Sequence, residues 1–179
     1  MISNRLNKII VCIILLIPIL VYAQNRVHLL KAGFLAKFAQ FTTWPADYSP
    51  QPDKDKFIIT IIGKDPFYDV LQTVYQNQKI KGCDIQVRQI QTVEDIDNTH
   101  ILFISKNMKS ELTLILEYVK DKPIMTVSDS DGFGRKGVLI NFYITEKGTL
   151  HFEFNSTIMK RSSLKINLLL LEIAKVIQY

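Results

Sequence analysis

The sequence predicts an α/β fold, a three-layer sandwich in which helices cover both faces of a mostly parallel central sheet with a C-terminal antiparallel hairpin. Apolar β-branched runs alternate with amphipathic segments through the middle of the chain, a pattern typical of parallel strands joined by helices. Two further runs follow, and the Glu146-Lys147-Gly148 turn between them is typical of a hairpin. The chain has 179 residues, which is enough for one domain with its own core and short for two.

Residues 1–23 have the order of a secretory signal peptide. Two basic residues precede an apolar run over residues 9–21, and Ala23 then supplies a small residue at a cleavage position. The run is short for a membrane anchor, since a spanning helix needs about 20 apolar residues. We therefore expect cleavage after Ala23, export to the periplasm, and a mature protein with one domain over residues 24–179.

The mature chain carries a small basic excess and a single thiol. Removing residues 1–23 takes away two basic residues and no acidic one, so the net charge falls from +5 to +3. The remaining basic residues are scattered, and export also argues against a nucleic-acid partner. Cys83 is the one cysteine left, which excludes an internal disulfide. We interpret it as a small buried residue, with pairing to another chain as the alternative.

The first helix is expected over Asn25–Phe41. Asn25 is a suitable N-cap, and Trp44-Pro45 ends the helix because the residue before proline avoids helical backbone angles. Trp44 thus lies at the helix exit, where we expect part of it to be exposed. The apolar residues that recur at steps of three and four and form the buried face are Val27, Leu30, Phe34, Phe38 and Phe41.

The middle of the chain predicts alternating strands and helices. The segments over 57–62 and 100–105 are almost continuously apolar, as in strands covered on both faces, whereas Ile85, Val87 and Ile90 alternate with polar residues. Asp65 is expected to cap the first of these helices and Pro66 to open it. The expected elements are a strand over 57–62, a helix from Pro66, a strand over 85–90, a turn over 93–96, a strand over 100–105, a helix over 112–119 and a strand over 124–127.

The C-terminal part predicts a hairpin, a capped turn and a final helix. The hairpin strands are expected over 138–144 and 150–154, followed by a helical turn that Asn155 caps. The last helix is expected over Ser163–Gln178 and is apolar almost all round, so we expect it to be buried on more than one side. Either the N-terminal helix or a second chain would supply the covering surface.

The loop Ser128–Gly137 is the segment with the most function-like composition. Its alternating Ser and Asp residues resemble half of a calcium loop, but Ile140 would occupy the twelfth position, where a bidentate Glu is needed. Its glycines resemble a phosphate loop, yet a strand follows where a phosphate site needs a helix N-terminus. We interpret Ser128–Gly137 as a mobile, solvated recognition loop whose acidic start forms a capped turn.

No set of residues in the sequence forms a recognisable catalytic group or metal site. His28, His100 and His151 lie on different expected elements and lack metal-ligand spacing. The serines lack a nucleophile-elbow context, and no nucleophile, base and oxyanion donor can be named together. We therefore predict no catalytic residues, no metal and no cofactor, and we expect the protein to act by binding.

Several sequence blocks occur in order between Val27 and Ile177. They are Lys31–Leu35 (KAGFL), Phe38-Ala39, Phe41, Trp44-Pro45, His100–Ser105 (HILFIS), Thr126–Asp129 (TVSD), Gly132-Phe133, Gly137, Ile140–Phe142 (INF), Phe152–Asn155 (FEFN), Leu164–Ile166 (LKI) and Leu168-Leu169. Together these blocks resemble the YfiR-like family of periplasmic proteins (YfiR/HmsC-like).

The resemblance implies a periplasmic signalling regulator that works through protein–protein interaction. Members of the family restrain a membrane-anchored diguanylate cyclase by contacting its periplasmic part, so that cyclic-di-GMP output and biofilm behaviour respond to the envelope. Related domains accompany sensor kinases, and dimers are frequent. The chain departs from the family at Thr99, where Cys is common, and at Val138, where a second Gly is frequent. Disulfide-based redox sensing is therefore not expected.

We expect the partner-binding residues to be Trp44, Phe133, Arg135 and Lys136, with the C-terminal helix as the candidate homodimer surface. For Phe133 the alternative is burial in the core. The alternative function is a periplasmic small-ligand sensor that feeds a sensor kinase, with Arg135 or Lys136 contacting an anion. The sequence assigns no further ligand-binding residues.

Overall fold

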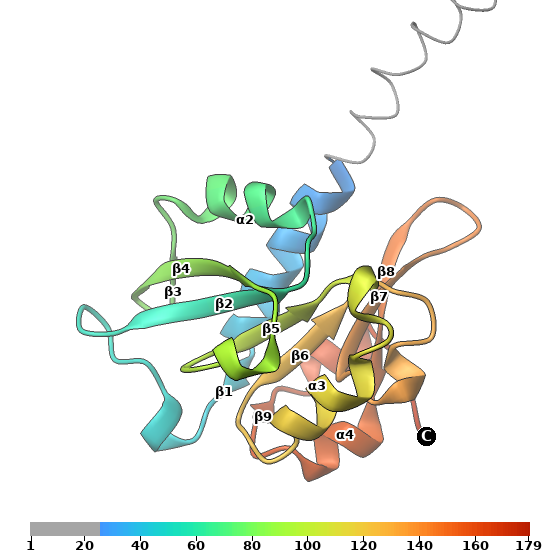
Figure 1. Cartoon of the computed structure of the whole chain (residues 1–179). Helices are drawn as coiled ribbons and strands as arrows, with labels where there is room; N and C mark the ends of the chain where they lie inside the picture. Colours follow the sequence, from blue (N-terminus) through green and yellow to red (C-terminus); the bar gives the residue numbers. More distant parts are fainter. Residues whose placement is uncertain (1–25) are drawn as a thin grey trace, which may run out of the picture.

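The structure, a computed structural model, describes residues 26–179. The expected signal peptide, residues 1–23, lies outside the described residues. The main sheet has eight strands in the order β10-β8-β7-β6-β5-β2-β4-β3 (Figure 1). This mixed, mostly parallel sheet with helices on both faces confirms the predicted fold class.

The centre of the sheet is parallel. β2 (Lys56–Ile62) pairs with β4 (Cys83–Ile90) on one side and with β5 (Ile101–Ile104) on the other. β6 (Met125–Ser128) and β7 (Ile140–Ile144) continue the parallel series. All residues of β5 and β6 are buried, because helices cover these strands on both faces.

The edges of the sheet depart from the parallel pattern. β3 (Lys79–Ile80) pairs antiparallel with β4, a short edge hairpin that the sequence pattern did not reveal. β8 (Leu150–Asn155) pairs antiparallel with β7, as the hairpin prediction requires. β10 (Lys175–Ile177) then adds to β8 in parallel, so that β10 rather than the hairpin forms this edge.

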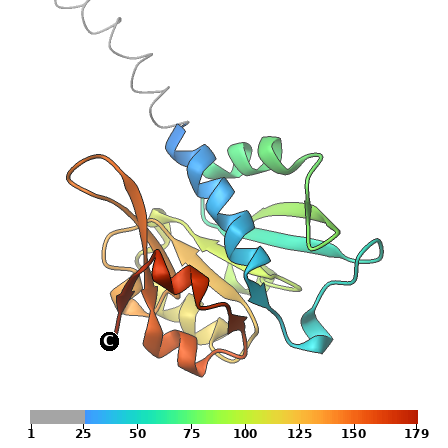
Figure 2. The ribbon, with the colours of Figure 1, turned by 180° about the vertical axis from the view of Figure 1, so that it is seen from behind.

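Helices form a layer on each face of the sheet. The N-terminal helix, residues 26–40, and α2 (Phe67–Tyr75) cover one face, and α3 (Leu112–Val119) covers the other. Figure 2 shows the N-terminal helix crossing the sheet, with the C-terminal segment beside it. The Tyr75 hydroxyl donates to the Ala32 carbonyl oxygen at 2.6 Å and so joins the two helices of this layer.

Each face of the sheet has its own core. Beneath the N-terminal helix, Phe38 packs on Phe142 and Phe152, with ring centroids 5.6 and 4.8 Å apart. Cys83 is buried in this core as a free thiol, which agrees with the interpretation as a small buried residue. The core on the α3 side consists of Ile62, Val93, Ile96, Leu102, Ile104, Met108, Leu112, Ile115, Val119, Phe133 and Val138.

Two predicted caps are present. Asp65 Oδ1 accepts from the Phe67 N–H at 2.9 Å, just before α2. Asn155 Oδ1 accepts from the N–H groups of Thr157 and Ile158 at 3.0 and 3.1 Å, so that a turn of helix follows β8 at once. The remaining helical elements are η1 (Ala46–Tyr48), η2 (Val93–Asp95), η3 (Lys106–Met108), η4 (Gly134–Lys136) and α4 (Ser156–Arg161).

The predicted helix over Ser163–Gln178 is wrong. This segment forms β9 (Lys165–Ile166), a short α5 (Leu169–Glu172) and β10. β9 pairs with β1 (Thr42–Thr43), and β10 pairs with the free edge of β8. The backbone hydrogen bonds that a helix would make locally are thus made with distant strands. Side-chain bonds assist this arrangement, since Ser162 Oγ accepts from the Leu164 N–H and Asn167 Oδ1 from the Leu169 N–H.

Candidate functional site

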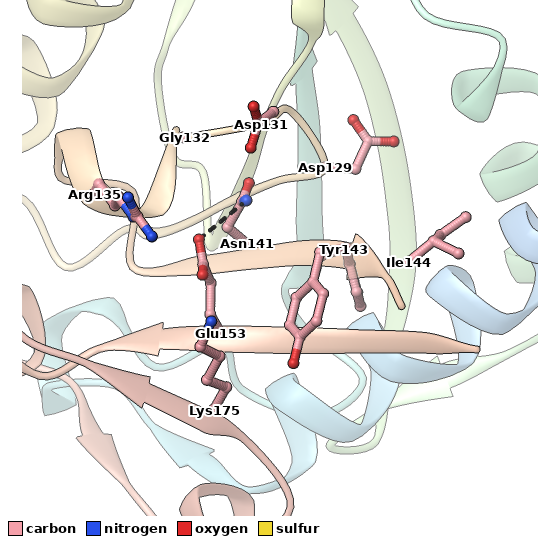
Figure 3. A pocket seen from close by; sticks show the side chains of 10 residues that line it. Asp129, Asp131, Gly132, Arg135, Asn141, Tyr143, Ile144, Glu153 and Lys175 are labelled. Carbon is pink, nitrogen blue, oxygen red and sulfur yellow. Dashed lines mark hydrogen bonds between the residues drawn. The ribbon is translucent and has the colours of Figure 1, made fainter. Parts of the chain in front are cut away.

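A polar pocket of about 490 Å³ lies between the loop that follows β6 and the outer strands β7, β8 and β10 (Figure 3). It opens on the face opposite the N-terminal helix, because Asn141 and Glu153 alternate along their strands with the aromatic residues of the core beneath that helix. The polar side chains that define its character are Asp131, Arg135, Asn141, Tyr143, Glu153 and Lys175.

Strand register places three of these side chains in one row. Asn141 on β7 lies opposite Glu153 on β8, and Glu153 lies opposite Lys175 on β10. Residues opposite one another on neighbouring strands point to the same face of a sheet. The row therefore depends on β10 being a strand, because only this pairing brings Lys175 next to Glu153.

The amide of Asn141 is the most buried polar group of the pocket. Its Nδ2 donates to Glu153 Oε1 at 3.3 Å, while its Oδ1 is buried and has no hydrogen-bond partner among residues 26–179. The residue is 2% exposed. Figure 3 shows this amide at the centre of the pocket, between the side chains of Asp131 and Glu153. A buried acceptor without a donor is costly, so this position favours a hydrogen-bond donor from outside the chain.

The loop over the pocket is held by its own hydrogen bonds and by β8. Asn155 Nδ2 donates to the Gly134 carbonyl oxygen at 2.8 Å. A side chain at Gly134 would collide with Glu153 Oε1, so glycine permits the close approach of η4 to this carboxylate. Ser128 Oγ donates to the Ile104 carbonyl oxygen and accepts from the Ser130 N–H, which is the predicted capped turn.

An ion pair fixes the start of this loop. Lys31 of the N-terminal helix is 6% exposed and binds the carboxylate of Asp129. Asp65 and His28 lie close enough to both groups to feel their charges. Burial, with the nearby Asp129 carboxylate as a smaller contribution, raises the pKa of Asp65. Burial and the Lys31 charge lower the pKa of His28.

The four predicted partner-binding residues do not form one surface. Trp44 is 3% exposed and lies in the core beneath the N-terminal helix, where its ring packs edge-on against Phe57. Phe133 is 1% exposed and lies in the core on the α3 side. The expectation that both side chains are available to a partner is therefore corrected. Arg135 and Lys136 are exposed, but only Arg135 lines the pocket.

The reason for both burials is local. The left-handed Gly137 closes η4, and the Val138 N–H donates to the Phe133 carbonyl oxygen at 3.1 Å, so the backbone on both sides of the buried ring is held in a closed turn. The loop is thus a hydrogen-bonded cover anchored by an aromatic side chain, rather than the solvated loop that we expected. Trp44 directly follows β1, whose pairing with β9 fixes the backbone on its N-terminal side.

Sequence reasoning missed the centre of the pocket, namely Asn141, Glu153 and Lys175. The alternation in β8 did indicate that Glu153 points away from the core. Asn141 interrupts an otherwise apolar strand, and that interruption was the available signal. The position of Lys175 beside Glu153 could not be predicted, because the sequence pattern places Lys175 in the expected helix over Ser163–Gln178. Within residues 26–179, no three His, Cys, Asp or Glu side chains are grouped so that they would hold a metal ion.

The fold and the pocket define an α/β sandwich protein with a polar pocket at the outer strands of its sheet. The sequence profile of the YfiR/HmsC-like family matches residues 28–175, and the chain belongs to this family. The family is one of periplasmic regulators rather than of catalysts. No curated protein matches the chain in a sequence search. Across residues 26–179, no helix has the length and apolar character needed to cross a membrane.

Proposed function

We propose that the protein is exported to the periplasm and represses a membrane-anchored diguanylate cyclase by contacting its periplasmic part. The observation that carries this proposal is the family match. It spans residues 28–175, which is nearly all of the described residues 26–179. A periplasmic regulator of this family needs a stable surface that a membrane protein can recognise. Exposed groups held on a rigid loop provide such a surface at a low cost in conformational entropy.

Arg135 and Lys136 are the residues that we assign to the contact. Both are exposed, and both belong to η4, whose backbone is fixed by Asn155 and by the buried Phe133 ring. Two neighbouring cations favour an acidic patch on the partner. Phe133 and Trp44 contribute to this surface from the inside, by holding the loop and the helix exit in place.

Charge reversal tests this contact. In cells that carry the cyclase, Arg135→Glu/Lys136→Glu is expected to raise cyclic-di-GMP and to reduce co-purification of the cyclase from membranes. The matched control is Lys106→Glu/Lys109→Glu, which changes the charge equally at another exposed pair. Equal repression by the wild type and the first variant would contradict the assigned surface. Unchanged cyclic-di-GMP after deletion of the whole gene would contradict the proposed repression itself.

A second function is favoured by the pocket. Its volume of about 490 Å³ lies in the range of small-molecule sites, and it is lined by Asn141, whose buried Oδ1 has no donor among residues 26–179. A ligand there would make the protein a small-ligand sensor, which feeds either the cyclase or a sensor kinase. The two kinds of output are distinguished by deletion, since only cyclase control changes cyclic-di-GMP directly.

A further inference from the structure

The amide orientation of Asn141 is fixed by its neighbour. Its Nδ2 donates to the Glu153 carboxylate, so exchanging the amide oxygen and nitrogen would place two acceptors against each other. Asn141 Oδ1 therefore stays buried and without a donor in the described part of the chain. The pocket thus lacks one specific group, a hydrogen-bond donor.

Four charged side chains of the pocket are also left without ion-pair partners. Within residues 26–179, Asp131 and Glu153 form no ion pair, and neither do Arg135 and Lys175. The two cations instead lie near aromatic rings. Arg135 Cζ is 5.5 Å from the centroid of the Tyr179 ring, and Lys175 Nζ is 5.6 Å from the centroid of the Tyr143 ring. Asp129 also lines the pocket, but its charge is already paired with Lys31. Two carboxylates and two cations are thus left in one pocket without an ion pair.

This combination determines the class of ligand. An ammonium group would supply the donor that Asn141 Oδ1 lacks and would be neutralised by Asp131 and Glu153. An acidic group on the same molecule would meet Arg135 and Lys175. These four side chains sum to zero charge, which matches a ligand that carries both charges. We propose that the pocket binds a small zwitterion with an ammonium group and a carboxylate or phosphate group.

Calorimetric titration of the purified mature protein tests the proposal without any partner. The probes are glycine, β-alanine and 4-aminobutyrate, which separate the two charges by increasing distances, and phosphoethanolamine, which carries a phosphate. N-acetylglycine and glycinamide are the matched controls, since each lacks one of the two charges. We expect at least one probe to bind and both controls to bind at least about tenfold more weakly. Binding by the amino acids alone assigns a carboxylate, and binding by phosphoethanolamine alone assigns a phosphate.

Substitutions in the pocket locate the binding. Asp131→Asn keeps the side-chain size, and Arg135→Gln replaces the guanidinium by a shorter neutral side chain; both positions are exposed. Each variant is expected to weaken binding about tenfold or more. Lys136→Gln is the control, because this exposed neighbour does not line the pocket. The proposal is overturned if no probe binds at millimolar concentration, if the controls bind equally well, or if both pocket variants bind like the wild type. None of these outcomes bears on repression of a cyclase, which is measured separately in cells.

Discussion

Individual buried charges constrain this protein most strongly where the N-terminal helix meets the loop after β6. Lys31 is almost fully enclosed, and its partner Asp129 is separated from it by 98 positions in sequence. A buried ammonium is tolerated only when it is paired. This one contact therefore fixes both the helix position and the first residue of the loop that covers the pocket.

Replacing Asp129 should cost more stability than replacing Lys31. Asp129→Asn leaves the Lys31 charge buried and unpaired, and we expect a loss of about 3 kcal/mol in the free energy of unfolding, the low end for such pairs because Asp129 is partly exposed. Lys31→Met leaves a carboxylate that water can reach, so we expect a loss of about 1 kcal/mol. Urea unfolding measures both.

The double variant Lys31→Met/Asp129→Asn is the control for this pair. Its loss should be smaller than that of Asp129→Asn alone, because the unpaired charge is gone. Losses that simply add would show that the two groups do not interact in solution.

His100 should make stability fall in mild acid. Burial lowers its pKa, and its Nδ1 accepts from the Ile58 N–H at 2.9 Å, a bond that protonation would break. Below the unfolded value of about 6.5 the unfolded chain binds a proton that the folded chain does not. This contribution to stability is complete above that pH and is lost as the pH falls toward the folded pKa. His28 acts in the same direction.

Unfolding free energies measured between about pH 5 and pH 8 check this expectation. His100→Gln removes the titrating ring and keeps a side-chain acceptor for the Ile58 N–H. The variant should show a shallower decline in mild acid than the wild type. An unchanged pH profile would mean that His100 does not contribute.

At the scale of elements, the loop over the pocket behaves as part of the fold. η4 is held by the Asn155 side chain from β8 and by Phe133 in the core on the α3 side. Its exposed residues are therefore displayed on a fixed backbone. The same logic applies at the C-terminus, where α5 and β10 replace one long helix because the edge of β8 was available for pairing.

Phe133→Ala should separate a structural role from a contact role. Removing this buried ring is expected to lower the free energy of unfolding by about 3–5 kcal/mol. Arg135→Ala should change it by at most about 0.5 kcal/mol, because the side chain is exposed and lacks an ion pair among the described residues. Chemical denaturation of the two variants measures the difference. A small loss for Phe133→Ala would mean that the ring is not a core residue in solution.

At the scale of the whole molecule, only some of the apolar side chains of the C-terminal segment are buried in the core. Leu164, Leu170 and Ile177 are buried, whereas Leu168 and Ile173 are 71% and 61% exposed. Among residues 26–179, the edge strand β10 also has one side without a strand partner. The sequence predicts a homodimer through a C-terminal helix. Because α5 and β10 replace that helix, self-association through these two elements stays a prediction.

We expect the mature protein to sediment as a homodimer. Leu168→Lys/Ile173→Lys should shift the equilibrium toward monomer, because charges would be buried at the interface. The thermal midpoint of the monomeric form should hardly change, since both side chains are exposed. Analytical ultracentrifugation distinguishes the two states, and a wild type that remains monomeric at high concentration would contradict this expectation.

Local patterns were sufficient for most elements of the fold. Apolar runs predicted β2, β5, β6 and β7 to within a few residues, and alternating polar and apolar residues predicted β4 and β8. The capping side chains Asp65 and Asn155 marked two helix starts. These features depend on neighbouring residues in sequence. For Phe133 the alternative of burial in the core is confirmed, and Trp44 is buried where we expected part of it to be exposed. The sequence did not decide between these positions, because a loop aromatic faces the core or the solvent according to the backbone turns around it.

The sequence by itself determined the alternating α/β architecture and the family blocks, since both are encoded in hydrophobic periodicity and in short local motifs. Only the tertiary structure decided that the last segment becomes strand, and with it the row of Asn141, Glu153 and Lys175. The physical reason is that an apolar segment can satisfy its backbone hydrogen bonds either within itself or with a distant strand. That choice depends on which sheet edge the rest of the chain leaves free.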